Sequence, residues 1–324
     1  MFGHVARIGI TSMLAAGTIG CGAPGNVHQD AMYEVVVTED VVFGQGLARS
    51  AWEADDAVAM DLLLDVYQPT DESLEDLPVV VLIHGGGFKG GTHKKPELVD
   101  MGYHFAERGW VAFSIDYRVL PNFGPLPEGY PAAPEAMTTE IQRNQWKAFY
   151  PACRDAKAAV RWIRANAEEY RLDTGRIAAI GGSAGSFLSV ALGVTNDDDC
   201  VTEIPVEDDP TLASTHLEES SSVDTIIDHW GGPSIVRMLE ALEPGDRFDA
   251  TDAPISIVHG KLDPTVPFSE AEALKAEYDE TGVPYAWYPL ENAGHGPWEA
   301  EVDGKSLSDL AFDFIVEHQD LTVD

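Results

Sequence analysis

The fold is decided by the stretch Ile-Ala-Ala-Ile-Gly-Gly-Ser-Ala-Gly, residues 177–185. A short apolar run ends there in small residues, and the apolar run Phe187–Leu192 follows directly. A turn this tight between a strand and a helix strains the backbone at Ser183, and small neighbours let the turn close. The pattern therefore predicts a serine hydroxyl that projects above the edge of a sheet.

Similar apolar runs recur on both sides of this turn. Each is bounded by turn residues and is predicted to be a strand covered on both faces. They are Val79–Ile83, Val111–Ile115, Ile177–Ile180 and Ile255–Val258, with Val35–Val42 and Leu62–Tyr67 as a hairpin-like start. Helical periods lie in residues 156–167 and 307–315. Alternating strands and helices predict an α/β fold with a mostly parallel sheet and helices on both faces.

We expect residues 33–324 to form a single domain. Two segments fit no regular element, about 120–150, which is rich in Pro and Gly, and 196–222, which is rich in acid. Such insertions in an α/β domain normally lie on loops and shape binding sites. Pro151 is then expected in the first turn of the helix that follows.

The charge of the chain excludes one class of partner. Its 324 residues include 55 Asp and Glu but only 20 Lys and Arg, a formal net charge of −35. Nucleic acid would be repelled, and binding to anionic lipid is disfavoured. The excess acid is interpreted as a solvated surface, and adaptation to salty surroundings is a sharper hypothesis for it.

Residues 1–21 are predicted to be a signal peptide. Arg7 precedes an uncharged run of signal-peptide length that ends in small residues. Thr18-Ile19-Gly20-Cys21 looks like a bacterial lipoprotein box, with an atypical first residue, and Cys21 as the lipidated residue. Residues 22–32 are expected to be a polar tether. We therefore expect a protein of the bacterial cell envelope that is exported, whether secreted, periplasmic or tethered to the membrane through Cys21.

Two further cysteines remain, Cys153 and Cys200. Export permits a disulfide. Cys153 is expected at the start of one helix and Cys200 beyond the far end of the next, on opposite sides of the sheet. This interpretation favours two separate thiols and leaves a bridge as the alternative.

A glycine-rich loop follows the strand Val79–Ile83. It reads His84-Gly85-Gly86-Gly87-Phe88, and its glycines let backbone N–H groups turn toward one point, as an oxyanion requires. The N–H of Ala184, next to the serine, is the expected partner donor. His84 is expected to shape the loop by hydrogen bonding.

The same loop matches a dinucleotide-binding pattern, Gly85-x-Gly87-x-x-Gly90. We reject this alternative because no helix opens at the third glycine and because it leaves the serine turn unexplained. A phosphate-binding P-loop fails because Gly90-Gly91-Thr92 lacks the required lysine.

A serine nucleophile needs a base and an orienting carboxylate, and two late turns supply them. Asp263 follows the strand Ile255–Val258, and His295 follows the extended run Tyr285–Leu290. The order Ser183, Asp263, His295 is that of an α/β-hydrolase. His259 is expected to pack under the acid turn. No clustered Cys/His spacing is present, so we predict no catalytic metal and no cofactor.

With these residues in place, residues 34–320 resemble α/β-hydrolase-fold esterases. The resemblance is to the lipase and carboxylesterase group with an HGGG-type loop, including bacterial acetylxylan and feruloyl esterases. It is carried by the following segments: Leu64–Tyr67, His84–Phe88, Asp116–Arg118, Asp155–Trp162, Gly181–Gly185 and the turns of Asp263 and His295. One departure is Gly182, where capped relatives carry Asp before the serine.

The resemblance implies a central sheet of about eight strands and a serine esterase. Ser183 would be the nucleophile, Asp263 the acid and His295 the base, with Gly86, Gly87 and Ala184 as the oxyanion hole. The substrates would be small esters of short acyl or aryl acids, or acylated polysaccharide. Two alternatives stay open: a serine peptidase of the prolyl-oligopeptidase type, and a non-catalytic binding protein of the same fold. The oligomeric state is left open.

Overall fold

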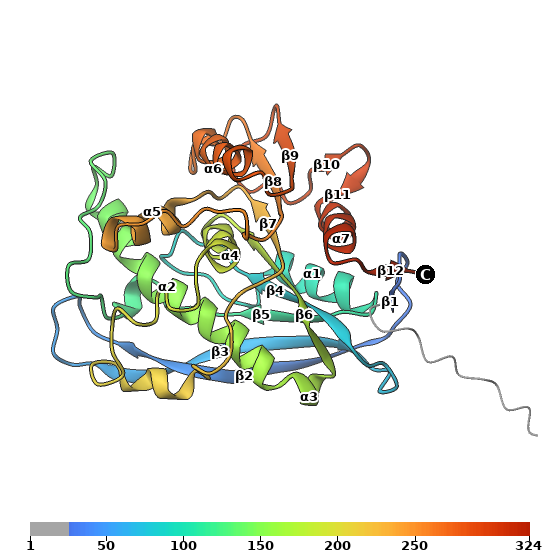
Figure 1. Ribbon diagram of the computed structural model, residues 1–324, viewed down its shortest axis with the longest axis horizontal. Helices are drawn as coiled ribbons and strands as arrows, with labels where there is room; N and C mark the ends of the chain where they lie inside the picture. Colours follow the sequence, from blue (N-terminus) through green and yellow to red (C-terminus); the bar gives the residue numbers. More distant parts are fainter. Residues whose placement is uncertain (1–25) are drawn as a thin grey trace, which may run out of the picture.

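A computed structural model describes residues 26–324 of the chain (Figure 1). The predicted signal peptide and Cys21 lie outside these residues. The core is an eight-stranded sheet with the order β2-β3-β5-β4-β6-β7-β8-β9. Its strands are β2 (Val35–Ala48), β3 (Val58–Pro69), β4 (Leu77–Ile83), β5 (Val111–Ile115), β6 (Leu172–Gly182), β7 (Thr225–His229), β8 (Ile255–Gly260) and β9 (Tyr285–Leu290).

The sheet is mostly parallel, as predicted. β2 pairs with β3 and β3 with β5 in antiparallel register, and every other pair from β5 to β9 is parallel. The helices are α1 (Pro96–Ala106), α2 (Glu140–Ala165), α3 (Ala167–Tyr170), α4 (Ala184–Val194), α5 (Ser234–Leu242), α6 (Phe268–Thr281) and α7 (Leu307–His318). Short 3-10 turns lie at Leu120–Asn122 and Pro210–Ser214. This is the predicted α/β-hydrolase fold.

Helices cover both faces of the sheet because its central strands are apolar on both faces. Val79, Val81 and Ile83 of β4 pack in the cluster that contains α2, α4 and α5. Val80 and Leu82, the alternate residues, pack in the cluster that contains α1 and α7. Figure 1 shows α1 and α7 together on one side of the sheet and α2 with α4 on the other.

The irregular insertion expected at 120–150 is wrong in its last third, which is helical. Thr139 caps α2 through a hydrogen bond from the backbone N–H of Gln142, so the helix begins at Glu140. Pro151 therefore lies inside α2 rather than in its first turn. The 26-residue helix crosses one face of the sheet and brings its N-terminal turns to the glycine-rich loop. β7, residues 225–229, was not predicted because its run of Thr-Ile-Ile-Asp-His is short and ends in polar residues.

Cys153 and Cys200 form a disulfide, contrary to the favoured interpretation of two thiols. Their Cα atoms lie 6.1 Å apart and both side chains are buried. The physical reason is the early start of α2, which puts Cys153 in the middle of the helix. The loop after α4, residues 196–222, then folds back over α2 and carries Cys200 to it.

The described part of the expected tether, 26–32, is docked on the domain. β1 (Asn26–Val27) pairs in parallel with β12 (Thr322–Val323) near the C-terminus. Val27 is fully buried, and Met32 donates a backbone hydrogen bond to Glu107. The segment from Val27 to Met32 is therefore part of the folded domain rather than a free tether. Among residues 26–324, no helix has both the length and the apolar content needed to cross a bilayer.

We predict that the disulfide contributes a large part of the stability. Closing a loop of 47 residues lowers the entropy of the unfolded chain by an amount worth about 4 kcal/mol. The double variant Cys153→Ala/Cys200→Ala should lose about that much free energy of unfolding in urea, while keeping its fold. Peptide mapping without reductant should find the two cysteine peptides joined. A double variant as stable as the oxidised protein would contradict the prediction.

Candidate active site

Ser183 lies in the turn between β6 and α4, with the unfavourable backbone angles φ 57° and ψ −120°. The turn closes because glycines flank it: a Cβ atom on Gly185 would lie 2.0 Å from the carbonyl oxygen of Ile83. The backbone N–H of Ser183 donates to the carbonyl of His229, at the end of β7. The strained conformation is thus held by the two strands on either side of β6.

The structure brings Ser183, His295 and Asp263 into one hydrogen-bonded row. His295 Nε2 lies 2.9 Å from Ser183 Oγ, and His295 Nδ1 lies 2.7 Å from Asp263 Oδ2. The three side chains come from the ends of β6, β8 and β9, because parallel strands present their carboxyl ends at the same edge of a sheet. This geometry allows His295 to accept a proton from the hydroxyl while Asp263 fixes the ring.

The turn after β8 fixes Asp263 as a hydrogen-bond acceptor. Its Oδ1 atom accepts backbone hydrogen bonds from Thr265 at 2.7 Å and Val266 at 3.0 Å. Oδ2 is left for His295. Underneath, His259 lies 3.0 Å from the carbonyl oxygen of Val266 and 3.5 Å from Asp263, which agrees with the packing role predicted for it.

The glycine-rich loop lies beside the serine turn. Among the hydrogen bonds of residues 26–324, none uses the backbone N–H of Gly86, Gly87 or Ala184 as a donor. Gly86 and Gly87 line the same pocket as Ser183, and Ala184 is the residue after it. His84 shapes the loop from below, with Nδ1 3.0 Å from the carbonyl of Gly85. Burial lowers the pKa of His84 to about 4, so this imidazole is neutral at physiological pH.

Asp116, directly after β5, lies between His84 at the start of the glycine-rich loop and His93 beyond its end. Its carboxylate accepts the backbone N–H of His93 at 2.7 Å and lies 2.8 Å from the Nδ1 atom of the same residue. It also lies 3.7 Å from Nε2 of His84. Sequence analysis did not assign this role to Asp116, although it quoted the residue within the Asp116–Arg118 segment.

His93 is buried between three carboxylates. Its Nε2 atom lies 3.1 Å from Asp65 and 3.3 Å from Asp40. Burial favours the neutral ring, but the hydrogen bond and charge of Asp116, together with Asp65, raise the pKa of His93 above its ordinary value. Asp40, Asp65 and His93 have spacing that suits a metal. However, the ammonium of Lys94 lies 2.8 Å from Asp40 and 2.7 Å from Glu39, so a cation already contacts this cluster.

A pocket of about 320 Å³ opens over the serine. Apart from the residues already described, its walls include Trp230, Trp298, Gln145, Lys89 and Thr265. Trp298 packs so close to the serine turn that a Cβ atom on Gly182 would lie 2.4 Å from its ring. The aromatic side chain therefore occupies the room that a larger residue before Ser183 would need. The sequence alone did not identify Trp298, because its contact with Gly182 joins residues far apart in the chain.

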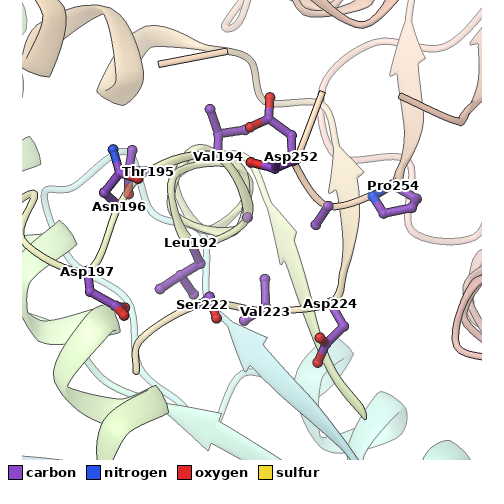
Figure 2. Close-up of a pocket in the computed structure, with 13 residues that line it drawn as sticks. Leu192, Val194, Thr195, Asn196, Asp197, Ser222, Val223, Asp224, Asp252 and Pro254 are labelled. Carbon is purple, nitrogen blue, oxygen red and sulfur yellow. The ribbon is translucent and has the colours of Figure 1, made fainter. Parts of the chain in front are cut away.

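A second hollow lies at the other end of the strands (Figure 2). It measures about 400 Å³ and lies between the end of α4 and the segments that lead into β7 and β8. Burial raises the pKa of Asp252 in its wall to about 7, and Asp224 accepts a backbone hydrogen bond from Ile177. Ligands of such sheets bind at the carboxyl ends of the strands, so this hollow at the amino ends is not the site of the chemistry.

Known proteins with similar sequences include several esterases. Esterase LipC of Mycobacterium tuberculosis is 26% identical over 263 residues, which cover 72% of this chain and 56% of LipC. Esterase LipQ of the same organism is 23% identical and is covered over 62% of its length. The chain thus spans little more than half the length of these relatives.

Solved structures agree on the fold. Esterase 2 of Thermogutta terrifontis, phosphorylated by paraoxon, has a TM-score of 0.58 and 26% identity, with 85% of this chain and 94% of that chain covered. Its propionate-bound form has the same TM-score and coverage at 25% identity. A carbohydrate esterase from gut microbiota has a TM-score of 0.60 at 21% identity, covering 91% and 99%, which shows the shared fold. The resemblance to α/β-hydrolase-fold esterases is confirmed.

The family match covers more than half of the chain. The BD-FAE family model matches residues 64–133 and 136–249, a range that includes the glycine-rich loop, Asp116 and the serine turn. Asp263 and His295 lie beyond its end, so their placement depends on the structure. With this match, the chain belongs to the BD-FAE family.

Proposed function

We propose that the protein hydrolyses carboxylic esters of short acyl or aryl acids through an acyl-enzyme intermediate on Ser183. The observation that carries the proposal is the row of Ser183, His295 and Asp263 with separations of 2.9 and 2.7 Å. A strained serine turn with unpaired amides beside it adds support. A buried, satisfied serine would need neither the strain nor the base.

In the first half of the reaction, Ser183 Oγ attacks the carbonyl carbon of the ester. His295 Nε2 takes the hydroxyl proton, and the carbonyl oxygen becomes an oxyanion. The N–H groups of Gly86, Gly87 and Ala184 donate to this oxyanion, each worth roughly 3–4 kcal/mol of the barrier. The tetrahedral intermediate collapses, and the alcohol leaves with the proton from His295.

In the second half, water replaces the alcohol. His295 removes a proton from the water, whose oxygen attacks the acyl carbon. The second oxyanion is bound by the same amides, and Ser183 leaves with the proton returned by His295. Asp263 remains ionised and stabilises the charged imidazolium in both halves, because the backbone N–H groups of Thr265 and Val266 hold its other oxygen.

The acyl group is proposed to be short or flat. The pocket over Ser183 holds about 320 Å³, and Trp230 and Trp298 line one part of it. The similar Thermogutta esterase binds propionate. Small esters and acylated polysaccharides both present such acyl groups.

Replacing Ser183 with Ala should lower kcat for p-nitrophenyl acetate by roughly 10⁶-fold, because the nucleophile is lost while the fold remains. Paraoxon, which phosphorylates the Thermogutta esterase, should add a diethylphosphoryl group to the wild-type protein and none to the variant, as measured by intact mass. Ser73→Ala, at an exposed serine, is the matched control and should behave as wild type. Activity that survives Ser183→Ala would refute the nucleophile assignment.

Replacing Asp116 with Asn should reduce kcat about tenfold and leave KM within about twofold. The neutral side chain weakens the contacts to His93 and His84, so the loop amides are less well aligned for an oxyanion that exists only after attack. Because the pKa of His93 is raised, its charged form stabilises the fold at low pH, and this contribution is lost as pH rises through that pKa.

The pH dependence of this contribution can be measured. Asp116→Asn should destabilise the protein more at pH 5 than at pH 9 in urea unfolding. The control Asp100→Asn, at an exposed position on α1, should change neither kcat nor the pH dependence of the free energy of unfolding. Equal destabilisation at both pH values, or a loss confined to KM, would contradict the positioning role.

We also propose that the protein is exported and that Cys21 is the lipidated N-terminus of the mature chain, a tether to the membrane of the cell envelope. The support is the sequence of residues 1–21 alone. Expression in a bacterium with radiolabelled palmitate should label the wild-type protein and not Cys21→Ala, while Cys153→Ala/Cys200→Ala should still be labelled. A mature N-terminus at any residue other than Cys21 would refute lipidation.

A further inference from the structure

A third hollow lies beside the active site and has no part in the mechanism. It measures about 540 Å³, larger than the pocket over Ser183. It lies between the β2–β3 connection, the segment before α2 and the first turns of α2. Its walls are formed by Arg49, Trp52, Glu53, Leu126, Pro127, Tyr130, Pro131, Ala132, Ala133, Arg143, Trp146 and Lys147.

The walls of this hollow are held in place by hydrogen bonds. Trp146 donates from Nε1 to the carbonyl of Pro131 at 3.0 Å, and Tyr130 donates its hydroxyl proton to the carbonyl of Trp146. Trp52 donates from Nε1 to Asn144 at 3.2 Å. Trp146 is almost fully buried. The hollow is therefore preformed.

One helix connects the hollow to the proposed oxyanion loop. Arg143, Trp146 and Lys147 have the i, i+3, i+4 spacing that puts side chains on one face of α2, and they line the hollow. Gln145 lies between them in sequence, lines the active-site pocket and donates a hydrogen bond to the carbonyl of Gly87 at 2.7 Å. A ligand that spans the two sites would thus cross α2 at Gln145.

The cations of this hollow are unpaired, which is unusual in a chain with a net charge of −35. Arg49 and Lys147 form neither an ion pair nor a side-chain hydrogen bond with any residue in the described part of the chain, and the Nε atom of Arg49 is buried without a partner. Arg143 donates only to backbone carbonyls. Among residues 26–324, only Lys89, in the active-site pocket, shares the unpaired state of Arg49 and Lys147.

The acids near the hollow do not neutralise these cations. Glu53 lines the hollow but forms no ion pair with a described residue. Asp56, which interacts with Arg49 over a longer distance, accepts a hydrogen bond from the backbone of Ser50. Burying the guanidinium of Arg49 without a partner is unfavourable in free energy, even though the chain has 55 acidic residues that could pair with it. A bound anion would remove this unfavourable term.

We propose that this hollow binds a six-membered ring that carries a carboxylate. The carboxylate would pair with Arg49 and Lys147, and the ring would lie against the aromatic walls of Trp52 and Tyr130. Lys147 already lies 5.4 Å from the centre of the Trp52 ring, so charge and aromatic surface meet at one point. Two sources have this chemistry, a uronic acid unit of a polysaccharide and a free aromatic acid.

That the ring belongs to the ester substrate, as its alcohol portion, rests on the proposed function. The binding itself does not, and the two are tested separately. Calorimetric titration of the full-length wild-type protein measures binding without turnover. Cellobiouronic acid and cellobiose differ only in the carboxylate and represent the sugar source. The corresponding aromatic pair is 4-hydroxybenzoate and 4-hydroxybenzyl alcohol.

We expect the carboxylate member of one pair to bind at least tenfold more tightly than its neutral partner, and its affinity to fall as salt increases. The pair that shows this difference identifies the source. The variant Arg49→Met/Lys147→Met keeps the side-chain length and should abolish the tenfold preference. Lys275→Met/Lys305→Met removes the same charge from exposed ion pairs elsewhere and should retain it.

Three results would overturn the proposal. They are equal binding of carboxylate and neutral ligands in both pairs, no binding in either pair, and an equal loss of preference in both double variants. Esterase assays on p-nitrophenyl acetate are run on the same wild-type sample. A sample that binds the carboxylate ligand but does not hydrolyse p-nitrophenyl acetate would refute the proposed function and still support the binding site.

Discussion

The site depends on a single strained residue, Ser183, and on the backbone packing that stabilises its strained conformation. A φ of 57° at a residue with a side chain is unfavourable by itself. It persists because β6 is paired on both sides and because α4 begins at the next residue, against the backbone of Ile83. Any larger residue at Gly185 would separate the helix from the sheet. The hydroxyl is therefore presented by the whole strand–turn–helix unit, and the base and acid need only reach the same edge.

The base and the acid lie at that edge because each follows the carboxyl end of a parallel strand. β8 and β9 pair in parallel, so the turns that follow them leave on the same side of the sheet. Asp263 then meets His295 without any long-range adjustment, and both of its oxygens are satisfied, one by the ring and one by the backbone. A carboxylate held in this way cannot rotate away from the imidazole. On the other side of the serine, Asp116 accepts the backbone N–H of His93 and lies near His84, the first residue of the glycine-rich loop.

Sequence patterns predicted the apolar strands and the serine turn, and missed the start of α2 together with the contacts that depend on it. The apolar strands and the serine turn are set by neighbours within a few residues, so their positions could be read directly. The start of α2 was missed because its first turns are polar and Pro151 imitates a helix start. The same error led to the wrong interpretation of Cys153 and Cys200 as separate thiols. Their pairing depends on where the helix lies under a loop of irregular structure. The contacts of Asp116 and Trp298 were not predicted, because their partners are separated from them in the chain by more than 20 residues.

The net negative charge of the protein contrasts with a small group of unpaired cations near the active site. A strongly acidic surface repels anions and keeps most of the described cations in ion pairs or in hydrogen bonds to backbone carbonyls. Against that field, Lys89, Arg49 and Lys147 stand unpaired on both sides of Gln145. The wall of the hollow contains one acid, Glu53, which forms no ion pair with a described residue, whereas Lys147 lies 5.4 Å from the centre of the Trp52 ring. The arrangement is the one expected when the proposed carboxylate ligand supplies the missing negative charge at Arg49 and Lys147.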